Sequence, residues 1–214
     1  MAMHVAELWR YPVKSLRGEQ LEETELLASG VPGDRLVHLR AADRRIVTSR
    51  TRPALLGLAG TLGPDGVPHI DGEPWNAAIS RAKVLDAAGP GAELVLSVGS
   101  ERFDVLPLSI VTDGAVSALG VDRRRLRPNI VIGDVEGLTE RGWPGRYIRI
   151  GGATIALVKL RARCVMTTFD PDTLEQDHGV LRRIVREFDG TTALDAFVVE
   201  PGHVRIGDSV ELVP

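Results

Sequence analysis

Residues 58–70 have the sequence LAGTLGPDGVPHI, in which two short apolar runs flank a turn. Leu58 to Leu62 and Val67 to Ile70 each have the length of a short strand. The proline and glycine of Pro64-Asp65-Gly66 suit a tight reversal between them. Two such runs joined by turn residues are typical of an antiparallel hairpin. The stretch therefore predicts strand structure in the first half of the chain.

The same pattern extends toward the N-terminus. Val5 to Trp9 predicts a strand that ends at Tyr11-Pro12, because proline cannot donate to a sheet ladder. Leu21 to Leu27 predicts a second strand, and Arg35 to Arg40 with Ile46 to Thr48 predicts a hairpin. Short strands at this spacing favour a barrel or sandwich over an alternating α/β sheet.

Three segments of the chain predict helices. Ala77 to Ala88 is ended by Gly89-Pro90-Gly91, which we take as the boundary between two subdomains, residues 1–90 and 91–214. Thr112 or Asp113 can cap a short helix that runs to Leu119, and Leu181 to Phe188 has an apolar stripe at helical spacing. Further strands are predicted at Leu94–Val98, Leu108–Val111, Asn129–Ile132, Tyr147–Ile150, Thr154–Leu160, Phe197–Val199, Val204–Ile206 and Val210–Val213.

The composition is that of a globular protein, with 43% hydrophobic and 26% charged residues among 214. The net charge of −3 gives no reason to expect nucleic acid as a partner, although the run Arg123-Arg124-Arg125 could serve a small anion. One cysteine cannot form an internal disulfide. No secretory signal and no apolar run of about 20 residues is present. We therefore expect a cytoplasmic protein with no membrane partner.

Several common site motifs are absent from the sequence. It has no G-x-x-x-x-G-K-[ST], G-x-G-x-x-G or G-x-S-x-G motif, which argues against the common nucleotide-binding and serine-hydrolase sites. The five histidines are scattered, and there is no H-E-x-x-H or C-x-x-C pair. A dedicated zinc site is therefore not expected.

Three segments differ from ordinary strand and turn sequence: YPVKS at 11–15, LRPNIVI at 126–132, and RARCVMTT at 161–168 followed by DPDT at 170–173. Taken singly, each has an ordinary explanation. A cation at a strand end is usually solvated, a lone cysteine is most often a small buried hydrophobe, and an Asp-Pro-Asp-Thr run is usually a turn.

The surroundings of Cys164 favour a functional interpretation. Arg161 and Arg163 flank it at alternate positions, so both are expected on the opposite strand face, from which they still supply positive potential. Positive potential favours the thiolate, which attacks electrophiles and binds metals. Thr167 and Thr168 add hydroxyl donors for an anionic ligand. The segment predicts a ligand-binding site that contains Cys164.

Taken together and in this order, the three segments make the chain resemble the MOSC family, the β-barrel domains related to the C-terminal part of molybdenum cofactor sulfurase. The motifs are most similar to those of amidoxime-reducing-component-like members. The resemblance runs from Val5 to Val213. It implies a mainly β fold with a few helices, in which a MOSC-type β-barrel is joined to an N-terminal MOSC-associated β-barrel.

The resemblance also implies a molybdenum–molybdopterin cofactor whose metal is held by Cys164. Lys14 and Ser15 match positions that hold the pterin phosphate, and Arg35 matches another cofactor contact. The full set of residues implied to bind the cofactor is Lys14, Ser15, Arg35, Thr112, Asp113, Arg127, Asn129, Arg163 and Cys164. Such a set suits a phosphate, since lysine supplies a point charge and arginine a planar donor fork.

The chain departs from the family pattern in three places. Ala196 stands where amidoxime-reducing members carry a tyrosine near the cofactor, which leaves the shape of the substrate pocket open. The chain is shorter than those relatives around Asn76 to Gly91, and it lacks the four-cysteine ferredoxin extension of some bacterial members.

The resemblance implies a molybdenum oxidoreductase that reduces N-oxygenated substrates. Its electrons would come from a separate reductase, ferredoxin or flavin protein, because one cysteine cannot hold an iron–sulfur cluster and no dinucleotide motif is present. Two alternatives stay open. One is a metal-free sulfur carrier or transferase that uses a Cys164 persulfide, and the other is a non-catalytic molybdopterin-binding module.

Overall fold

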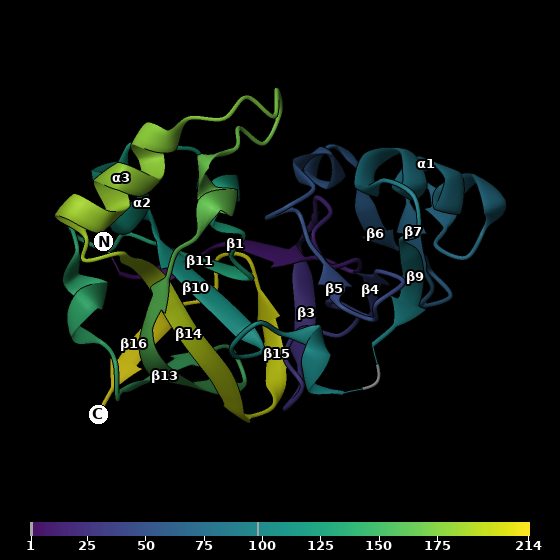
Figure 1. The fold of residues 1–214 in the computed structure, drawn as a ribbon. Coiled ribbons are helices and arrows are strands. Elements are labelled where there is room, and N and C mark those ends of the chain that lie inside the picture. Colours follow the sequence, from purple (N-terminus) through teal and green to yellow (C-terminus); the bar gives the residue numbers. More distant parts are fainter. Residues whose placement is uncertain (1, 98) are drawn as a thin grey trace.

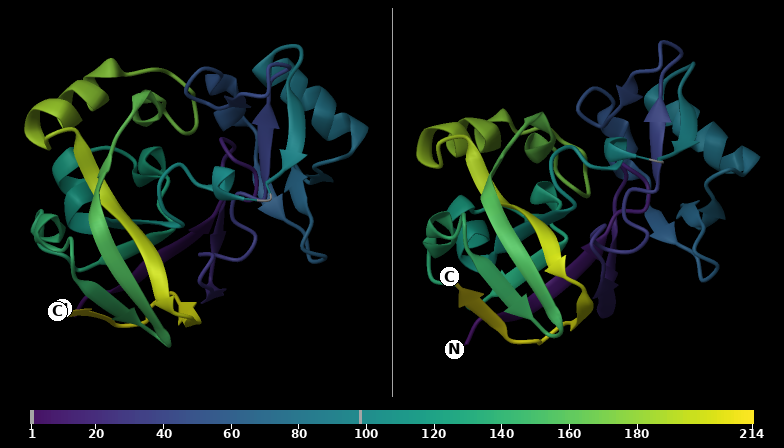
Figure 2. Two further views of the ribbon diagram at one scale, coloured as in Figure 1. Left: turned by 60° about the horizontal axis from the view of Figure 1, so that its bottom comes forward. Right: turned by 90° about the horizontal axis from the view of Figure 1, so that it is seen from below.

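The computed structural model describes residues 2–97 and 99–214 of the chain. The protein is rich in strands and has two lobes. In Figure 2 the blue segments of the first half of the chain form one lobe, and the green and yellow segments of the second half form the other. Both termini lie at the outer end of the second lobe (Figure 1).

Most strands and helices follow the predicted order, with shifts of three residues or fewer at their ends. The strand Thr191–Glu200 begins six residues before the predicted Phe197, and the short strand Glu73–Pro74 and the 3-10 helices (η) were not predicted. The first part contains β1 (His4–Arg10), β2 (Glu19–Leu21), β3 (Glu23–Leu26), β4 (Val37–Arg40), β5 (Ile46–Val47), η1 (Pro53–Gly57), β6 (Gly60–Leu62), β7 (Pro68–Ile70), β8 (Glu73–Pro74), α1 (Ala78–Ala88), β9 (Glu93–Leu96) and η2 (Ser100–Arg102). The second contains β10 (Leu108–Thr112), α2 (Asp113–Leu119), η3 (Arg123–Leu126), β11 (Ile130–Gly133), η4 (Thr139–Gly142), β12 (Tyr147–Ile150), β13 (Ala153–Ala162), η5 (Val165–Thr168), α3 (His178–Glu187), β14 (Thr191–Glu200), β15 (Gly202–Arg205) and β16 (Val210–Val213).

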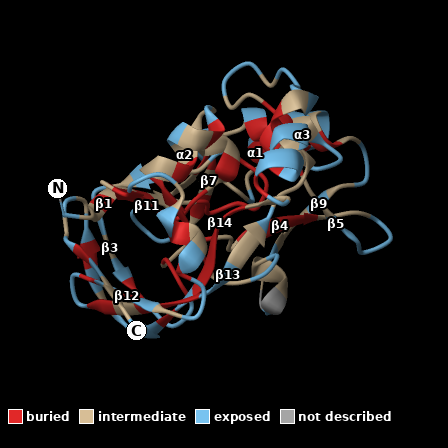
Figure 3. Ribbon diagram, turned by 90° about the vertical axis from the view of Figure 1, so that its left-hand side faces the viewer, coloured by how far each residue is buried: buried red, intermediate tan, exposed pale blue. Residues whose placement is uncertain are grey.

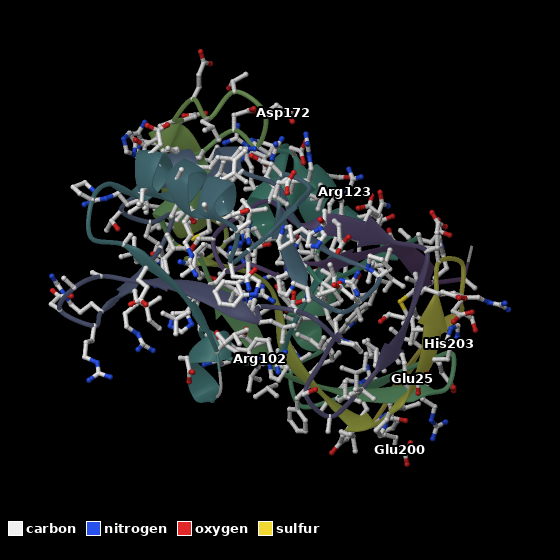
Figure 4. All side chains as sticks on the ribbon, turned by 90° about the vertical axis from the view of Figure 1, so that its right-hand side faces the viewer. Glu25, Arg102, Arg123, Asp172, Glu200 and His203 are labelled. Carbon is white, nitrogen blue, oxygen red and sulfur yellow. The ribbon has the colours of Figure 1, made fainter. Side chains whose placement is uncertain are left out.

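One predicted strand is divided in two, and another ends at a residue that the structure does not describe. The strand expected at Leu21–Leu27 is two strands, because the chain changes sheets at Glu22: β2 pairs with β1, whereas β3 pairs with β15. In the β15–β3 ladder His203 lies opposite Glu25, and both side chains point to solvent (Figure 4). Val98, at the end of the strand predicted at Leu94–Val98, lies outside the described residues.

An eight-stranded sheet with the order β16-β12-β13-β14-β10-β11-β1-β2 dominates the second lobe. Its neighbours are antiparallel except for β10 and β11, which are parallel. A parallel pair requires a crossover connection, and here α2 and η3 form it. Arg127 directly follows η3, three residues before β11 begins.

The large sheet curls until the β16 end reaches β1, the last strand but one at the other end. The amide of Val5 in β1 donates to the carbonyl of Asp208 at 2.9 Å, and the amide of Val210 in β16 donates to the carbonyl of Met3 at 2.9 Å. Among the described strands the pairing order does not itself run in a closed ring. The expectation of a strand-rich fold with a few helices is thus confirmed for the described residues.

Hydrophobic side chains fill both faces of the central strands. In β11, Ile130 and Ile132 pack inside the curl with Leu8 and Leu194, whereas Val131 packs outward. Alternating side chains of a strand point to opposite faces. The outward residues are buried because α2 and α3 cover that side of the sheet (Figures 1 and 3).

The first lobe has its own small core, with Val13, Leu39, Leu55 and Val84 fully buried or nearly so. It is built from the sheets β5-β4-β9 and β6-β7-β8 with α1. Strand pairing crosses the division predicted at residue 90 in both directions. β1 and β2 join the large sheet, and β9 pairs with β4. The division itself stays a prediction.

Candidate functional site

A cavity of about 110 Å³ lies between the two lobes. Six of the nine residues implied to bind the cofactor line it: Lys14, Ser15, Arg35, Arg127, Arg163 and Cys164. They come from four separate segments, two in each half of the chain. The fold therefore brings the YPVKS, RPN and RARC segments to one place.

The loop after β1 supplies Lys14 and Ser15. The Lys14 amide donates to the carbonyl of Val37 at 2.7 Å, which fixes the loop against β4. Ser15 is buried and has a φ of 76°, in the left-handed region. The Lys14 ammonium donates to the carbonyl of Glu101 at 3.0 Å and pairs with the Asp104 carboxylate at 2.7 Å. Lys14 is therefore held by a protein carboxylate inside the cavity.

Arg35 and Arg127 lie against the same aromatic ring. Their guanidinium carbons are 5.3 Å and 4.3 Å from the centre of the Tyr11 ring. Tyr11 is itself fixed, because its hydroxyl donates to the carbonyl of Pro128 at 3.0 Å and its amide donates to the buried Asp34 at 2.7 Å. Arg35 also pairs with Asp34.

Three residues of the cavity have left-handed backbone conformations: Ser15, Arg35 (φ 52°) and Arg127 (φ 51°). A non-glycine residue in this region costs about 1–3 kcal/mol, and such residues cluster at ligand sites where the surrounding structure holds them. Here that surrounding structure includes the hydrogen bond from the Arg35 amide to the carbonyl of Tyr11 at 2.7 Å. The strain supports a binding role for these positions.

Cys164 lies between the end of β13 and the start of η5. Its carbonyl accepts from the Thr167 amide at 3.1 Å and from the Thr167 hydroxyl at 2.9 Å. The Thr168 hydroxyl donates to the carbonyl of Val165 at 2.6 Å. Both threonine hydroxyls thus stabilise the turn, so the prediction that they donate to a ligand is not supported.

Arg161 and Arg163 were expected on the strand face opposite Cys164, but all three side chains line the cavity. The strand β13 ends at Ala162, and its pairing with β14 is irregular between Leu160 and Ala162. Alternation therefore does not continue to Cys164, and the two arginines lie on its own side.

The cavity has a strongly positive lining. Its cationic residues are Lys14, Arg35, Arg50, Arg125, Arg127, Arg161 and Arg163, and its one acidic lining residue within residues 2–97 and 99–214 is Asp104. Asp104 pairs with both Lys14 and Arg50. Burial alone would raise the pKa of Asp104, but the hydrogen bond from Lys14 and the nearby cations outweigh it and leave the pKa below its usual range.

Most of these cations have a carboxylate partner. Arg125 pairs with Asp170 at 2.9 Å and Arg161 with Asp195 at 2.6 Å. Arg127 and Arg163 differ, because no carboxylate of the described residues lies within ion-pair distance of either.

Arg163 donates to the carbonyl of Leu126 at 2.8 Å, and its buried Nε atom has no partner among the described groups. Burial lowers the pKa of both Arg127 and Arg163 to about 10, so both remain cationic at neutral pH. A buried charge without a partner is costly. These two arginines therefore point to an anionic ligand.

Three predicted residues lie elsewhere, and their polar groups are used by the fold. The Thr112 hydroxyl caps α2 by accepting from the Ala115 amide at 3.1 Å. Asp113 accepts from the amides of Asp134 and Val135 at 2.8 and 3.0 Å.

Asn129 is fully buried. Its side chain accepts from the Ser109 amide at 3.1 Å and donates to the carbonyl of Trp9 at 3.3 Å. It therefore ties β10 to β1. Ala196 is also buried, in the core inside the curled sheet opposite Leu108, and does not line the cavity.

Sequence reasoning missed Arg50 and Asp104, and it noted Arg125 only as part of a basic run. Arg125 had a local signal in the run Arg123-Arg124-Arg125. Arg50 and Asp104 lie in irregular segments with no motif, and only the fold brings them together. They pair at 2.6 Å.

Cys164 is a free thiol, and a thiolate is a soft metal ligand. Within the described part of the chain, no three His, Cys, Asp or Glu side chains gather in a way that could hold a metal ion. No helix among the described residues is both long and apolar enough to cross a membrane.

Comparison with family models identifies both halves of the chain. Residues 2–84 match the MOSC N-terminal beta barrel domain, and residues 107–211 match the MOSC domain. The chain therefore belongs to the MOSC family, in the form that carries both domains. The recognition made from the YPVKS, RPN and RARC segments is confirmed.

Among characterised proteins, the chain is distantly related to amidoxime-reducing components. It is 24% identical to mitochondrial amidoxime-reducing component 1 of Homo sapiens, over 98% of this chain and 82% of that protein. It is 24% identical to mitochondrial amidoxime reducing component 2 of Macaca fascicularis, over 79% of this chain and 67% of that protein. The crystal structure of the YUAD protein from Bacillus subtilis shares the fold, with a TM-score of 0.54 and 16% identity over 99% of this chain and 96% of that one.

Proposed function

We propose that the cavity binds a molybdenum–molybdopterin cofactor through Cys164 and that the protein reduces N-oxygenated compounds. The observation that carries the proposal is the convergence of a free thiol with Lys14, Arg35, Arg127 and Arg163 in one cavity. The distant relatives named above as amidoxime-reducing components support it. We further infer that the curled sheet and the sheets of the first lobe are the two barrels of this family.

The residues present fit such a cofactor. Its phosphate requires cations and hydroxyl donors, which Lys14, Ser15 and Arg35 would supply from the first lobe. Arg127 and Arg163 would supply positive charge that no carboxylate of the described residues neutralises. Thiolate is a ligand that softer metals prefer, and Cys164 would provide it. When bound, the cofactor would supply the oxidation–reduction chemistry by which an oxygen atom is removed from the substrate.

The residues of the chain would hold and orient the cofactor and neutralise the charge of its phosphate. Lys14 is paired with Asp104, so an incoming phosphate has to compete with that carboxylate for the ammonium. Tyr11 holds Arg35 and Arg127 in place through its ring, and burial raises the pKa of its hydroxyl to about 12. Tyr11 is therefore neutral at physiological pH and does not offset the positive charge of the cavity.

Electrons would come from a separate protein, a reductase, ferredoxin or flavin protein. The chain has one cysteine, which the proposal assigns to molybdenum, and an iron–sulfur cluster needs about four thiolates. Transfer between proteins of this kind uses small, transient contacts. The mouth of the cavity between the lobes is where such a partner would have to approach.

The test is to produce the chain in a host that synthesises molybdopterin and to measure molybdenum, pterin and turnover of benzamidoxime. We expect about one molybdenum per chain when the site is fully loaded, activity with reduced methyl viologen, and none with a reduced nicotinamide alone. Metal-free protein that carries a persulfide on Cys164 would favour a sulfur carrier instead. Loaded protein that reduces no N-oxygenated substrate with any electron donor would favour a non-catalytic molybdopterin-binding module.

A further inference from the structure

A second and larger cavity, of about 360 Å³, lies beside the first. Arg125, Arg127 and Met166 line both cavities. The second one is also formed by both lobes, since Arg17, Leu56 and Ala59 come from the first half of the chain. Its volume is within the range of small-molecule sites, about 300–1,000 Å³.

The walls of this second cavity are mainly aromatic and apolar. Trp9, Tyr11 and Phe169 line it together with Leu56 and Pro171. Tyr11, Phe169 and Leu56 are almost fully buried, so these walls are held by the surrounding core. Aromatic rings favour offset or edge-to-face contact with another flat ring. The shape and chemistry of the walls suit a planar, mostly apolar molecule.

The charge of the cavity adds a second requirement. Four arginines line it, and two of them are neutralised: Arg124 by Asp122 and Asp172, and Arg125 by Asp170. Arg17 and Arg127 have no ion pair with any carboxylate of the described residues. No acidic side chain from the described ranges lines this cavity. Its net positive charge favours an anionic group on the ligand.

Arg17 lies at a fixed position despite its exposed side chain. Its carbonyl accepts from the Gly60 amide at 2.8 Å, and its guanidinium donates to the carbonyl of Gly57 at 2.9 Å. The guanidinium group of Arg127 lies over the Tyr11 ring at 4.3 Å. Both arginines line the cavity, and both keep donors available to a ligand inside it.

We propose that this second cavity binds a small planar molecule of the aromatic carboxylate class, with its ring against Trp9, Tyr11 and Phe169 and its anionic group on Arg17 or Arg127. The inference goes beyond the proposed function, because it requires neither cofactor nor turnover. Arg17, Leu56 and Ala59 line this cavity and not the one at Cys164. The two sites can therefore be altered separately.

The test is calorimetric titration of the cofactor-free full chain with 2-naphthoate, and with 2-naphthylmethanol as the neutral analogue. We expect saturable binding of one naphthoate per chain. The alcohol should bind about tenfold more weakly, because it lacks the charge that the arginines complement. Tryptophan fluorescence should change on binding and stop changing in Trp9→Phe, since Trp75 and Trp143 pack in other cores.

Two variants locate the site. Ala59→Trp fills the cavity and should abolish binding, whereas Ala54→Trp, at an exposed position of η1, should not. Arg17→Ala should weaken naphthoate about fivefold and leave the alcohol unchanged, as expected for one exposed ion pair. Arg182→Ala, on the exposed side of α3, is the matched control. The proposal is overturned if naphthoate does not bind, if folded Ala59→Trp binds it like the wild type, or if the alcohol binds equally well.

Discussion

The arginines of residues 123–127, together with Arg163, form two groups. The groups differ in whether a carboxylate of the protein neutralises their charge. In the outer group, Arg123 pairs with Glu7, Arg124 with Asp122 and Asp172, and Arg125 with Asp170. Asp172 extends from a surface loop toward solvent, as Figure 4 shows. Arg127 and Arg163 form the inner group, which lines the Cys164 cavity without a carboxylate partner in the described structure.

Residue type alone therefore does not distinguish a structural arginine from one that binds a ligand. Arg124 and Arg127 are three positions apart, and both follow basic or apolar neighbours in one short segment. A cation that the protein neutralises itself contributes to folding, although an exposed pair contributes little, about 0–1 kcal/mol. A partly buried cation that the protein leaves unpaired lowers stability until an anion binds.

Of the substitutions in the cavity that the inner group lines, Cys164→Ser should have the largest effect on cofactor binding. Without the thiolate, molybdenum content should fall to background while the fold is kept, because a small polar replacement at a half-exposed turn changes stability by only about 0.5 kcal/mol. Elemental analysis and thermal unfolding of the same preparation separate the two effects. Full metal content in this variant would show that Cys164 is not the ligand.

Arg127→Met and Arg163→Met should each weaken cofactor binding and, at the same time, stabilise the cofactor-free protein. Each removes a charged hydrogen bond to the cofactor, worth about 1.5–3 kcal/mol, so retention should fall about ten- to a hundredfold. Each also removes an unpaired, partly buried charge, so the cofactor-free protein should become more stable by about 1 kcal/mol. Cofactor dissociation and denaturant unfolding measure the two quantities.

The outer group provides the control for this experiment. Arg124→Met should leave cofactor retention unchanged and lower stability by no more than about 1 kcal/mol. If Arg124→Met matched Arg127→Met in both measurements, the distinction between the two groups would have no functional content.

Asn129→Ala tests the one predicted ligand of the RPN segment that lies outside the cavity. It leaves the Ser109 amide and the Trp9 carbonyl without a buried partner, so we expect a loss of about 1–3 kcal/mol of stability. Cofactor content per folded chain should stay as in the wild type. Unchanged stability with lost cofactor would instead support the direct contact that the sequence suggests.

Asp104→Asn should have the smallest effect of these substitutions. It should change how tightly the cofactor-free protein binds an anion. Removing the carboxylate frees Lys14 and Arg50, so inorganic phosphate should bind about fivefold more tightly, measured by calorimetry. Weaker phosphate binding in this variant would contradict the idea that Asp104 competes for these cations.

The pH dependence of protein stability tests whether the ion pairs of Asp104 stabilise the fold. The pKa of Asp104 is lowered on folding, so its ion pairs stabilise the protein above the usual carboxyl pKa of 3.8 and stop doing so as pH falls through the lower folded value. The stability difference between wild type and Asp104→Asn should therefore be constant at neutral pH and shrink below pH 3.8.

The sequence predicted local structure better than pairing. The turn at 64–66, the cap at Thr112 and the stop at Gly89 depend on neighbouring residues, and the structure has a turn or helix end at each. It could not show that β10 and β11 are parallel or that β1 lies beside β11, because these pairings depend on packing between distant segments.

In the candidate site, Lys14, Ser15 and Cys164 lie together as predicted. The predicted residues whose side chains can also bond to buried backbone groups lie elsewhere. Lys14, Ser15 and Cys164 have no role in capping through their side chains, and they line the cavity. Thr112, Asp113 and Asn129 can satisfy buried backbone groups, and here they do so. Asp104 comes from an irregular segment, whose position only the folded chain determines.

The position of β1 also constrains how the molecule is made. His4 lies opposite Gly133, so the first strand leaves the ribosome on the order of ten seconds before its partner at about 5–20 residues per second. A fragment that starts at residue 91 would lack β1 and leave one edge of β11 unpaired, which invites aggregation. The second lobe therefore cannot complete its sheet without the first residues of the chain.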